Sequence, residues 1–259
     1  MLAAAAPAAL PQEAVDLASV TASLPLVRQV SLLEDESARL EADAAAASSG
    51  WRAATPAQLA HGFSGSALWF KGEVYNGSDR PATRWLAVGS SRLEDVRYYD
   101  ATQADAARWK EQYRAGVDTP VETHPVNATL SVFPITLQPG EHRRFMVRIE
   151  SRTSITVDLT LWKPESYLIA EHSTAMWQLC LTGSMLTLAA LAAVLGAVWH
   201  DRVFALLTAS IVAEAAYEFT YEGYLYLVLL HNGGDLVVRL TSILGNLTVA
   251  LFTATVMVF

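Results

Sequence analysis

Cysteine is almost absent from this chain: among 259 residues there is one, Cys180, and it lies in an apolar stretch. A single cysteine excludes an internal disulfide framework and a cysteine-based metal site. Charged residues are also scarce, at 17% of the chain, against roughly 25% in an ordinary soluble protein. The position of the missing charges is therefore the first guide to the organisation of the chain.

The shortage of charge is confined to the C-terminal third. Residues 1–175 hold 16 Lys and Arg and 21 Asp and Glu, whereas residues 176–259 have only Arg202 and Arg239 as cations. The first part is mildly acidic and has no cluster of basic residues, which argues against nucleic acid as a partner. The sequence predicts a soluble part followed by an apolar one.

Three long apolar runs occupy the second part, at about 176–199, 203–230 and 236–259. A membrane hydrocarbon core about 30 Å thick is crossed by about 20 helical residues. Because backbone groups cannot stay unpaired in lipid, helices are the expected conformation. Trp177 and Trp199 bracket the first run, as aromatic rings do at a membrane interface. We predict three transmembrane helices, with the lipid bilayer as partner.

The ends and loops suggest an orientation. Residues 1–14 resemble the end of a secretory signal without its cationic start; a disordered alanine-rich tail is the alternative. Arg202 lies between the first two runs, and cytoplasmic loops favour cations. We therefore expect the part before the first run to lie outside the cell membrane. The last run stops at Phe259 without a polar flank, which indicates a truncated chain.

Acidic residues recur inside the second run. Glu214, Glu218 and Glu222 are four residues apart, which places them on one face of a helix. Ionisable groups in lipid usually face other helices, and Arg239 begins the third run. We expect Arg239 to pair with Glu222 or Glu218. This polar seam is either a signalling or proton-sensitive element, or a structural one that orients helices.

Residues 15–163 read as an all-β domain. In HRRFMVRIES, Phe145, Val147 and Ile149 alternate with Arg144, Arg148 and Glu150, and SITVDLTLW (154–162) repeats the pattern. This period of two predicts strands with one face in a core and the other in water. Many short strands predict an antiparallel jelly-roll sandwich. Residues 27–47 are expected to give a strand and a short alanine-rich helix, packed on the sandwich as an arm.

The connection between the two parts is short. Leu161 ends the last predicted core strand, and Pro164 suits the first turn of a helix. We predict a helical junction over residues 164–175 that runs into the first membrane helix. A short stiff joint transmits movement in a way that a long Gly/Ser linker does not, which favours a receptor.

Candidate binding residues are aromatic and basic. Aromatic faces stack on sugar rings, and arginine binds carboxylates or phosphates. The candidates are Trp85, Arg97, Tyr99, Trp109 and Tyr113, with core or surface packing as the alternative for each. Tyr98 and Tyr99 must face opposite ways on a strand. No catalytic or cofactor motif occurs, and the scattered histidines predict no metal site.

Four stretches resemble a known family. They are GFSGSALWFKGEVYN (62–76), RWLAVGSSRLEDVRYYD (84–100), FPITLQPGEHRRFMVRIES (133–151) and LTLWKPESYL (159–168). In their order and spacing they are similar to the type-2 extracellular domain of bacterial seven-transmembrane receptors with diverse intracellular signalling modules. The resemblance covers about 100 residues and the membrane junction, and it carries no catalytic signature.

The resemblance implies a periplasmic jelly roll like carbohydrate-binding modules, and a multi-pass protein of the bacterial inner membrane. It also implies seven membrane helices and a cytoplasmic output module, which this sequence lacks. The leading hypothesis is a sensor for a small molecule, with a sugar as one candidate; a homodimer is left open. The alternatives are an adaptor that binds a protein, and an enzyme acting on glycans through carboxylates such as Glu73, Asp95 and Asp100.

Overall fold

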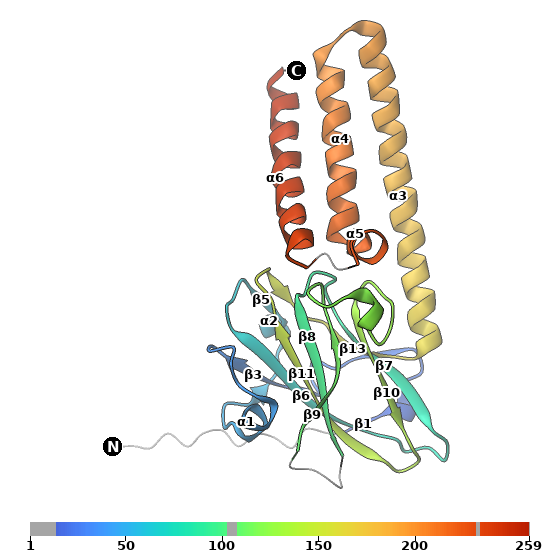
Figure 1. Ribbon diagram of the computed structural model, residues 1–259. Helices are drawn as coiled ribbons and strands as arrows, with labels where there is room; N and C mark the ends of the chain where they lie inside the picture. Colours follow the sequence, from blue (N-terminus) through green and yellow to red (C-terminus); the bar gives the residue numbers. More distant parts are fainter. Residues whose placement is uncertain (1–13, 103–107, 232–233, 259) are drawn as a thin grey trace. The chain divides into compact units, whose positions relative to one another are not determined.

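A computed structural model describes residues 14–102, 108–231 and 234–258 of the protein. The chain divides into two compact units, Met1–Tyr167 and Leu168–Phe259. Strands make up most of the first unit and helices the second (Figure 1). Of the tail predicted over residues 1–14, only Ala14 falls within the described residues.

Two main sheets form the first unit, within the residues described there. The longer has seven strands in the order β4-β3-β6-β11-β8-β9, with β1 paired to β6. Its strands are β1 (Val15–Asp16), β3 (Ser31–Asp35), β4 (Arg52–Ala53), β6 (Ala67–Tyr75), β8 (Asp95–Thr102), β9 (Lys110–Ala115) and β11 (His142–Glu150). The shorter has four strands in the order β10-β7-β13-β2. They are β2 (Ser23–Pro25), β7 (Ala82–Val88), β10 (Ser131–Leu137) and β13 (Leu159–Trp162).

Short elements complete this unit. Two small strands, β5 and β12, pair with each other. Helices and 3-10 turns lie in the connections. These elements are η1 (Leu17–Ser19), α1 (Ala42–Ala47), α2 (Pro56–Leu59), β5 (Ala60–Gly62), η3 (Val121–Thr123) and β12 (Ile155–Thr156).

The strand order is that of a jelly roll. One layer of the jelly roll is formed by the strands β6-β11-β8-β9 of the longer sheet. The other layer is formed by β2-β13-β7-β10, which make up the shorter sheet. Along the chain, β6 and β7 lie in different sheets, as do β7 and β8, β9 and β10, and β10 and β11. The described pairings among these eight strands are antiparallel. This is the double Greek-key arrangement, and the predicted sandwich is confirmed.

Alternate residues of the strands fill the space between the sheets. Phe145, Val147 and Ile149 of β11 are buried there, as their spacing predicts, together with Leu86 and Phe133 of the shorter sheet. Burying such side chains fully stabilises a fold by about 1.5–3 kcal/mol each. This core fixes which face of each strand points outward.

The outer face of the longer sheet is also covered, contrary to the prediction that it lies in water. Met146 is fully buried and Arg148 is 6% exposed. Met146 packs in a second cluster with Trp69, Tyr99 and the alanines of α1. The reason is the path of the predicted arm: its strand β3 joins the longer sheet beside β6, and Leu40 and α1, which follow, pack on the outer face. Alternation identifies the face of a residue, but only the tertiary fold decides what covers it.

The stretch predicted as one strand over residues 154–162 is divided. Its first half, β12, pairs with β5, and its second half, β13, lies between β7 and β2. At the break, the carbonyl of Asp158 accepts a hydrogen bond from Gly89 N–H at 2.6 Å. Ile155, Val157 and Leu159 remain buried, so the predicted alternation holds across the break.

The second unit contains helices that match the predicted membrane runs. Among the described residues, α3 (Pro164–Trp199), α4 (Arg202–Tyr221) and α6 (Gly234–Val258) are long and apolar enough to cross a membrane, by length and composition. Helix α3 also includes the predicted junction, without a break, and it begins in the sandwich unit. Helices α4 and α6 pack side by side (Figure 1).

The second predicted run is not one helix. Helix α4 ends at Tyr221, where Glu222 N–H donates to the carbonyls of Glu218 and Thr220. Gly223 then takes φ 86°, and a short helix α5 (Tyr224–Val228) follows. A residue with left-handed backbone cannot continue an α-helix, and glycine adopts this conformation at little cost. The expectation of a continuous helix over 203–230 is therefore wrong.

Candidate functional site

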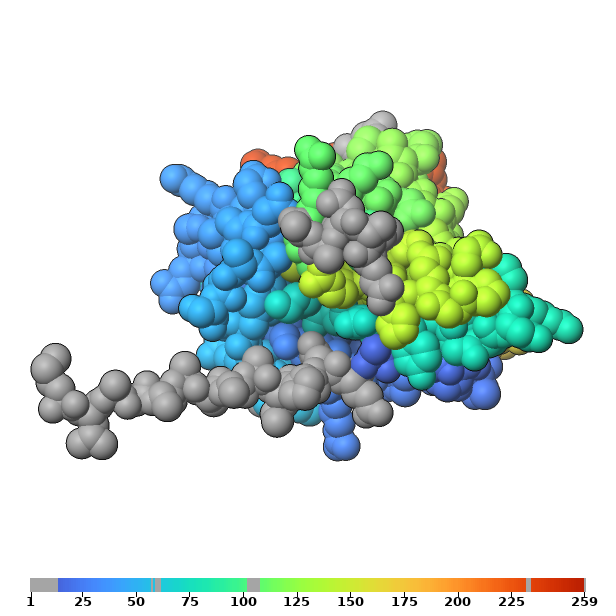
Figure 2. All heavy atoms as spheres, turned by 90° about the horizontal axis from the view of Figure 1, so that it is seen from below, coloured from blue at the N-terminus to red at the C-terminus, as the bar shows by residue number. Residues whose placement is uncertain are grey.

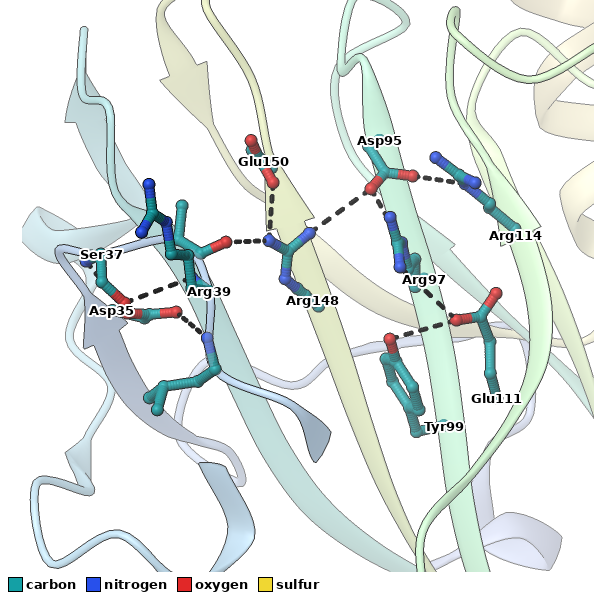
Figure 3. A network of polar contacts seen from close by, with 12 residues as sticks. Asp35, Ser37, Arg39, Asp95, Arg97, Tyr99, Glu111, Arg114, Arg148 and Glu150 are labelled. Carbon is teal, nitrogen blue, oxygen red and sulfur yellow. Dashed lines mark hydrogen bonds and ion pairs between the residues drawn. The ribbon is translucent and has the colours of Figure 1, made fainter. Parts of the chain in front are cut away.

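A polar network crosses the outer face of the longer sheet, with Arg148 of β11 near its centre (Figure 3). The Arg148 guanidinium donates to Glu150 Oε2 at 2.6 Å, to the Ala38 carbonyl at 2.8 Å and to Asp95 Oδ2 at 3.4 Å. It also lies 5.9 Å from the centre of the Trp69 ring. One arginine thus joins the sheet to the arm.

Asp95 is the acceptor shared by three arginines. Besides Arg148, it receives Arg97 Nε at 2.8 Å and Arg114 Nε at 2.6 Å. Arg97 contacts Glu111 at 3.8 Å, so three cations face three carboxylates in this network. Removing charges from water is costly unless each one is paired. The pairing found here satisfies these charges within the protein and links β8, β9 and β11.

Asp35, at the end of β3, accepts hydrogen bonds from the turn that leads to α1. Its carboxylate accepts hydrogen bonds from Ser37 Oγ at 2.6 Å, Ser37 N–H at 3.0 Å and Leu40 N–H at 2.9 Å. Burial raises the pKa of Asp35, but the hydrogen bonds from Ser37 and Leu40 outweigh it and lower the pKa overall. The charged carboxylate therefore stabilises this turn beside Arg148.

Three of the five predicted binding residues lie on this outer face. Arg97 pairs with Asp95, and Tyr99 Oη donates to Glu111 Oε2 at 3.2 Å. Burial, reinforced by the charge of Glu111, raises the pKa of Tyr99 to about 12. Trp109 packs against the second cluster. The polar groups of Arg97 and Tyr99 are thus engaged by the protein, and a ligand role for the three residues stays a prediction.

The other two predicted residues lie elsewhere. Tyr113 contacts Tyr98 and Phe133, with ring centroids 6.0 and 6.3 Å apart, at the edge of the central core. Trp85 belongs to the shorter sheet. Tyr98 and Tyr99 do face opposite ways, and each is buried, in a different cluster. The five residues therefore do not form one site.

An aromatic cluster joins the shorter sheet to the first turn of α3. The Tyr167 ring lies 5.6 Å from Trp85 at 67° and 5.9 Å from Trp162 at 81°. Such edge-to-face contacts add about 0.5–1.5 kcal/mol beyond area burial. Lys163 N–H donates to the Ala22 carbonyl at 2.8 Å. Strand β13, Lys163 and the first turn of α3 are thus anchored to the sandwich.

Tyr167 is one contact residue that the sequence pattern did not mark as part of a site. It is 4% exposed although it lies on a helix that turns apolar and exposed soon afterwards. The available signal was its position: an aromatic residue in the first turn of a helix that directly follows a tryptophan-ending strand. In the first turn of a helix that begins two residues after Trp162, the ring of Tyr167 can pack back against the end of β13.

The charged residues of the membrane helices are arranged differently from the prediction. Arg239 pairs with Asp235 at 2.6 Å, one turn earlier on α6, and not with Glu222 or Glu218. Four-residue spacing lets two side chains meet on one helix without any partner helix. Glu214 and Glu218 lie on α4, and Glu222 caps its end. The role of this seam stays a prediction.

Metal-binding geometry is not found among the described residues, where no three His, Cys, Asp or Glu side chains gather closely enough to hold an ion. The carboxylates considered for catalysis have separate partners. Glu73 contacts His142 at 3.2 Å, Asp95 binds the arginines, and Asp100 accepts from Gln112 at 2.9 Å.

A family of known proteins matches the sandwich. The family model described as 7TMR-DISM extracellular 2 matches residues 27–163, more than half of the chain. The match ends at Lys163, directly before α3 begins. It therefore covers nearly the whole sandwich. No curated protein matches the sequence.

Proposed function

Since the chain belongs to the 7TMR-DISM extracellular 2 family, as a membrane receptor with an outer N-terminal domain, we propose that it senses a small molecule in the bacterial periplasm. The sandwich is the sensing part, and α3 carries the signal into the inner membrane. A sugar is one candidate ligand. A homodimer and a cytoplasmic output module remain part of the same proposal.

The joint between sandwich and helix supports this proposal most directly. Only Lys163 separates the last strand residue, Trp162, from the first helix residue, Pro164. Tyr167 is buried against Trp162 and Trp85. A ligand that binds two arrangements of the sandwich with different affinity shifts their populations. Because the joint has no slack, such a shift moves the start of α3.

A catalytic role is less well supported. Glycoside hydrolysis uses two carboxyl groups about 5–9.5 Å apart across a bound sugar. Glu73, Asp95 and Asp100 each contact different partner residues, and Asp95 is held by three arginines. We therefore propose that the chain binds its ligand without transforming it.

A spin label on the native Cys180 would test the coupling. Cys180 is the single cysteine of the sequence. It is exposed and lies on α3. The full chain in lipid nanodiscs would be titrated with neutral sugars, inositols, amino acids and carboxylates. Binding is expected to change the spectrum of the label. A four-residue Gly/Ser insertion between Lys163 and Pro164 should abolish that change and leave binding intact.

A stiff insertion is the matched control. Seven helix-forming residues between Leu168 and Ile169 add about two turns and should preserve the response. A response that survives the Gly/Ser insertion would contradict mechanical coupling. Failure of every compound, together with saturable binding of a purified periplasmic protein, would favour the adaptor alternative.

A further inference from the structure

A polar cleft of about 390 Å³ opens at the edge of the sandwich, between β9 of the longer sheet and β10 of the shorter one. Its lining residues are Tyr98, Asp100, Gln112, Tyr113, Pro134, Thr136 and Arg143. The turn that joins β10 to β11 follows Thr136 and precedes Arg143. Figure 2 shows this yellow-green turn beside the teal segment that follows β6, and Gly140 N–H donates to the Asn76 carbonyl at 2.9 Å.

Polar residues replace apolar ones at this end of the core. Asp100 shares the inner face of β8 with Tyr98, and Arg143 shares the inner face of β11 with the buried Phe145. Asp100 is 8% exposed. By strand alternation, both positions belong to the core, where hydrophobic residues are the rule. The sandwich therefore places a charged pair where packing alone would favour apolar side chains.

A β-bulge shapes the cleft. Tyr98 pairs with Tyr113 and Tyr99 with Glu111, so Gln112 is the extra residue on β9. Bulges bend a strand locally and re-aim its side chains. Gln112 Nε2 accordingly reaches Asp100 Oδ1 at 2.9 Å. The edge strand thus supplies both an amide and an aromatic ring to the same hollow.

Two buried polar atoms of the lining have no hydrogen-bond partner among the described residues: Tyr98 Oη and Arg143 Nε. Tyr98 is 1% exposed. Its ring is fixed between Phe133 at 5.6 Å and Phe145 at 6.3 Å, so the hydroxyl cannot easily turn elsewhere. Buried polar groups are nearly always satisfied in native proteins. These two atoms give the cleft a donor and a hydroxyl that the described residues leave unsatisfied.

The charges of the lining are already balanced within the protein. Arg143 pairs with Glu141 at 2.6 Å and with Asp100 at 3.5 Å. Burial and the charge of Asp100 raise the pKa of Tyr98, so its hydroxyl stays protonated and can donate. A negative ligand would meet two carboxylates, and a positive one would meet Arg143. The arrangement favours a ligand without net charge.

We propose that this cleft binds a small uncharged molecule with several hydroxyl groups, which accepts from Arg143 Nε and hydrogen-bonds Tyr98 Oη. Tyr113 and Pro134 give the apolar wall against which the C–H face of such a molecule packs. The inference rests on the proposed sensing function and names its ligand class and its site.

Calorimetric titration of the full chain in nanodiscs tests the site. The probes are glucose, galactose, maltose and myo-inositol, with glucuronate and glucosamine as charged analogues of glucose. At least one neutral probe should bind, and the two charged analogues should bind at least about tenfold more weakly than that probe. Tyr98→Phe, which removes one hydroxyl, should weaken binding by about tenfold.

Tyr75→Phe is the matched control. Because Val74 faces the core, Tyr75 lies on the opposite face of β6, where its ring stacks on His142, and it does not line the cleft. It should leave the affinity unchanged. The Tyr98→Phe variant should keep a Tm at or above that of the native chain, since the lost hydroxyl has no partner there. Tighter binding of a charged analogue, no binding of any neutral probe, or an unaffected Tyr98→Phe variant would overturn the proposal. A cleft occupied by ordered water only would do the same. The Cys180 coupling test also includes amino acids and carboxylates, so a response to one of these would support sensing while overturning this ligand class.

Discussion

At the scale of single residues, the Asp35 side chain fixes the turn between β3 and α1 beside the longer sheet. Its carboxylate accepts from the next turn at Ser37 and Leu40, and the Ala38 carbonyl of that turn accepts from Arg148. Hydrogen bonds to a charged acceptor are about twice as strong as neutral ones. The segment from Ser37 to α1 that covers Met146 and Trp69 therefore depends on the charge of Asp35.

This arrangement predicts a pH-dependent contribution to stability. The folded pKa of Asp35 is lowered, so its contribution is fully present above the unfolded pKa of about 3.9 and is lost as the pH falls through the folded pKa. Asp35→Ala is expected to cost about 1–3 kcal/mol at pH 7. Chemical unfolding of the full chain in detergent, at pH values from 7 to 3, measures the difference.

Glu36→Ala is the control, because Glu36 is the exposed neighbour of Asp35. It should change stability little at any pH. A cost of Asp35→Ala that stays constant down to pH 3 would show that packing of the side chain, and not its charge, is what matters.

At the scale of elements, the first turn of α3 belongs to the sandwich. Tyr167 packs with Trp162 and with Ala87, Ala128 and Val132 of the cluster on the shorter sheet. The residues that follow it, such as Ile169, are exposed. One side chain thus separates the part of the helix that the sandwich holds from the part that it does not.

Tyr167→Ala is expected to release this turn. Truncating a buried aromatic residue typically costs about 3–5 kcal/mol, and here the loss should appear locally. Hydrogen exchange of the full chain in nanodiscs should become faster across residues 160–168 in this variant. Ile169→Ala, at an exposed position two residues further on, should leave the exchange unchanged. Equal protection in both variants would argue against an anchored joint.

The sequence predicts elements better than it predicts their surroundings. The alternation around Phe145, the start of α3 at Pro164 and the alanine-rich helix were all readable, because each depends on local pattern. The cover over Met146 depends on a segment more than 90 residues earlier in the chain, which local pattern does not reach. Gly223 was missed because a glycine inside an apolar run is compatible with a helix until its φ is known. Arg143 was missed because it stands between His142 and Arg144 in a polar stretch, although its spacing from Phe145 places it on the inner face of β11.

At the scale of the whole molecule, the chain is expected to cross the membrane with its sandwich outside. Arg202 at the start of α4 follows the first membrane run and favours a cytoplasmic loop there. On a Cys180→Ser background, a membrane-impermeant maleimide should label Asp79→Cys in intact spheroplasts. It should label His200→Cys only after permeabilisation. Labelling of His200→Cys in intact cells would reverse the orientation and contradict the receptor proposal.

Strand β13 is both the last strand of the sandwich and an inner strand of the shorter sheet, between β7 and β2. During synthesis and export, β2 leaves first and β13 leaves last, just ahead of the first apolar helix. Strand β2 cannot join β7 and β10 in one sheet until β13, which ends at Trp162, has been exported. We therefore expect the domain to mature only once its entire length is across, with its unfinished interior open to chaperones until then.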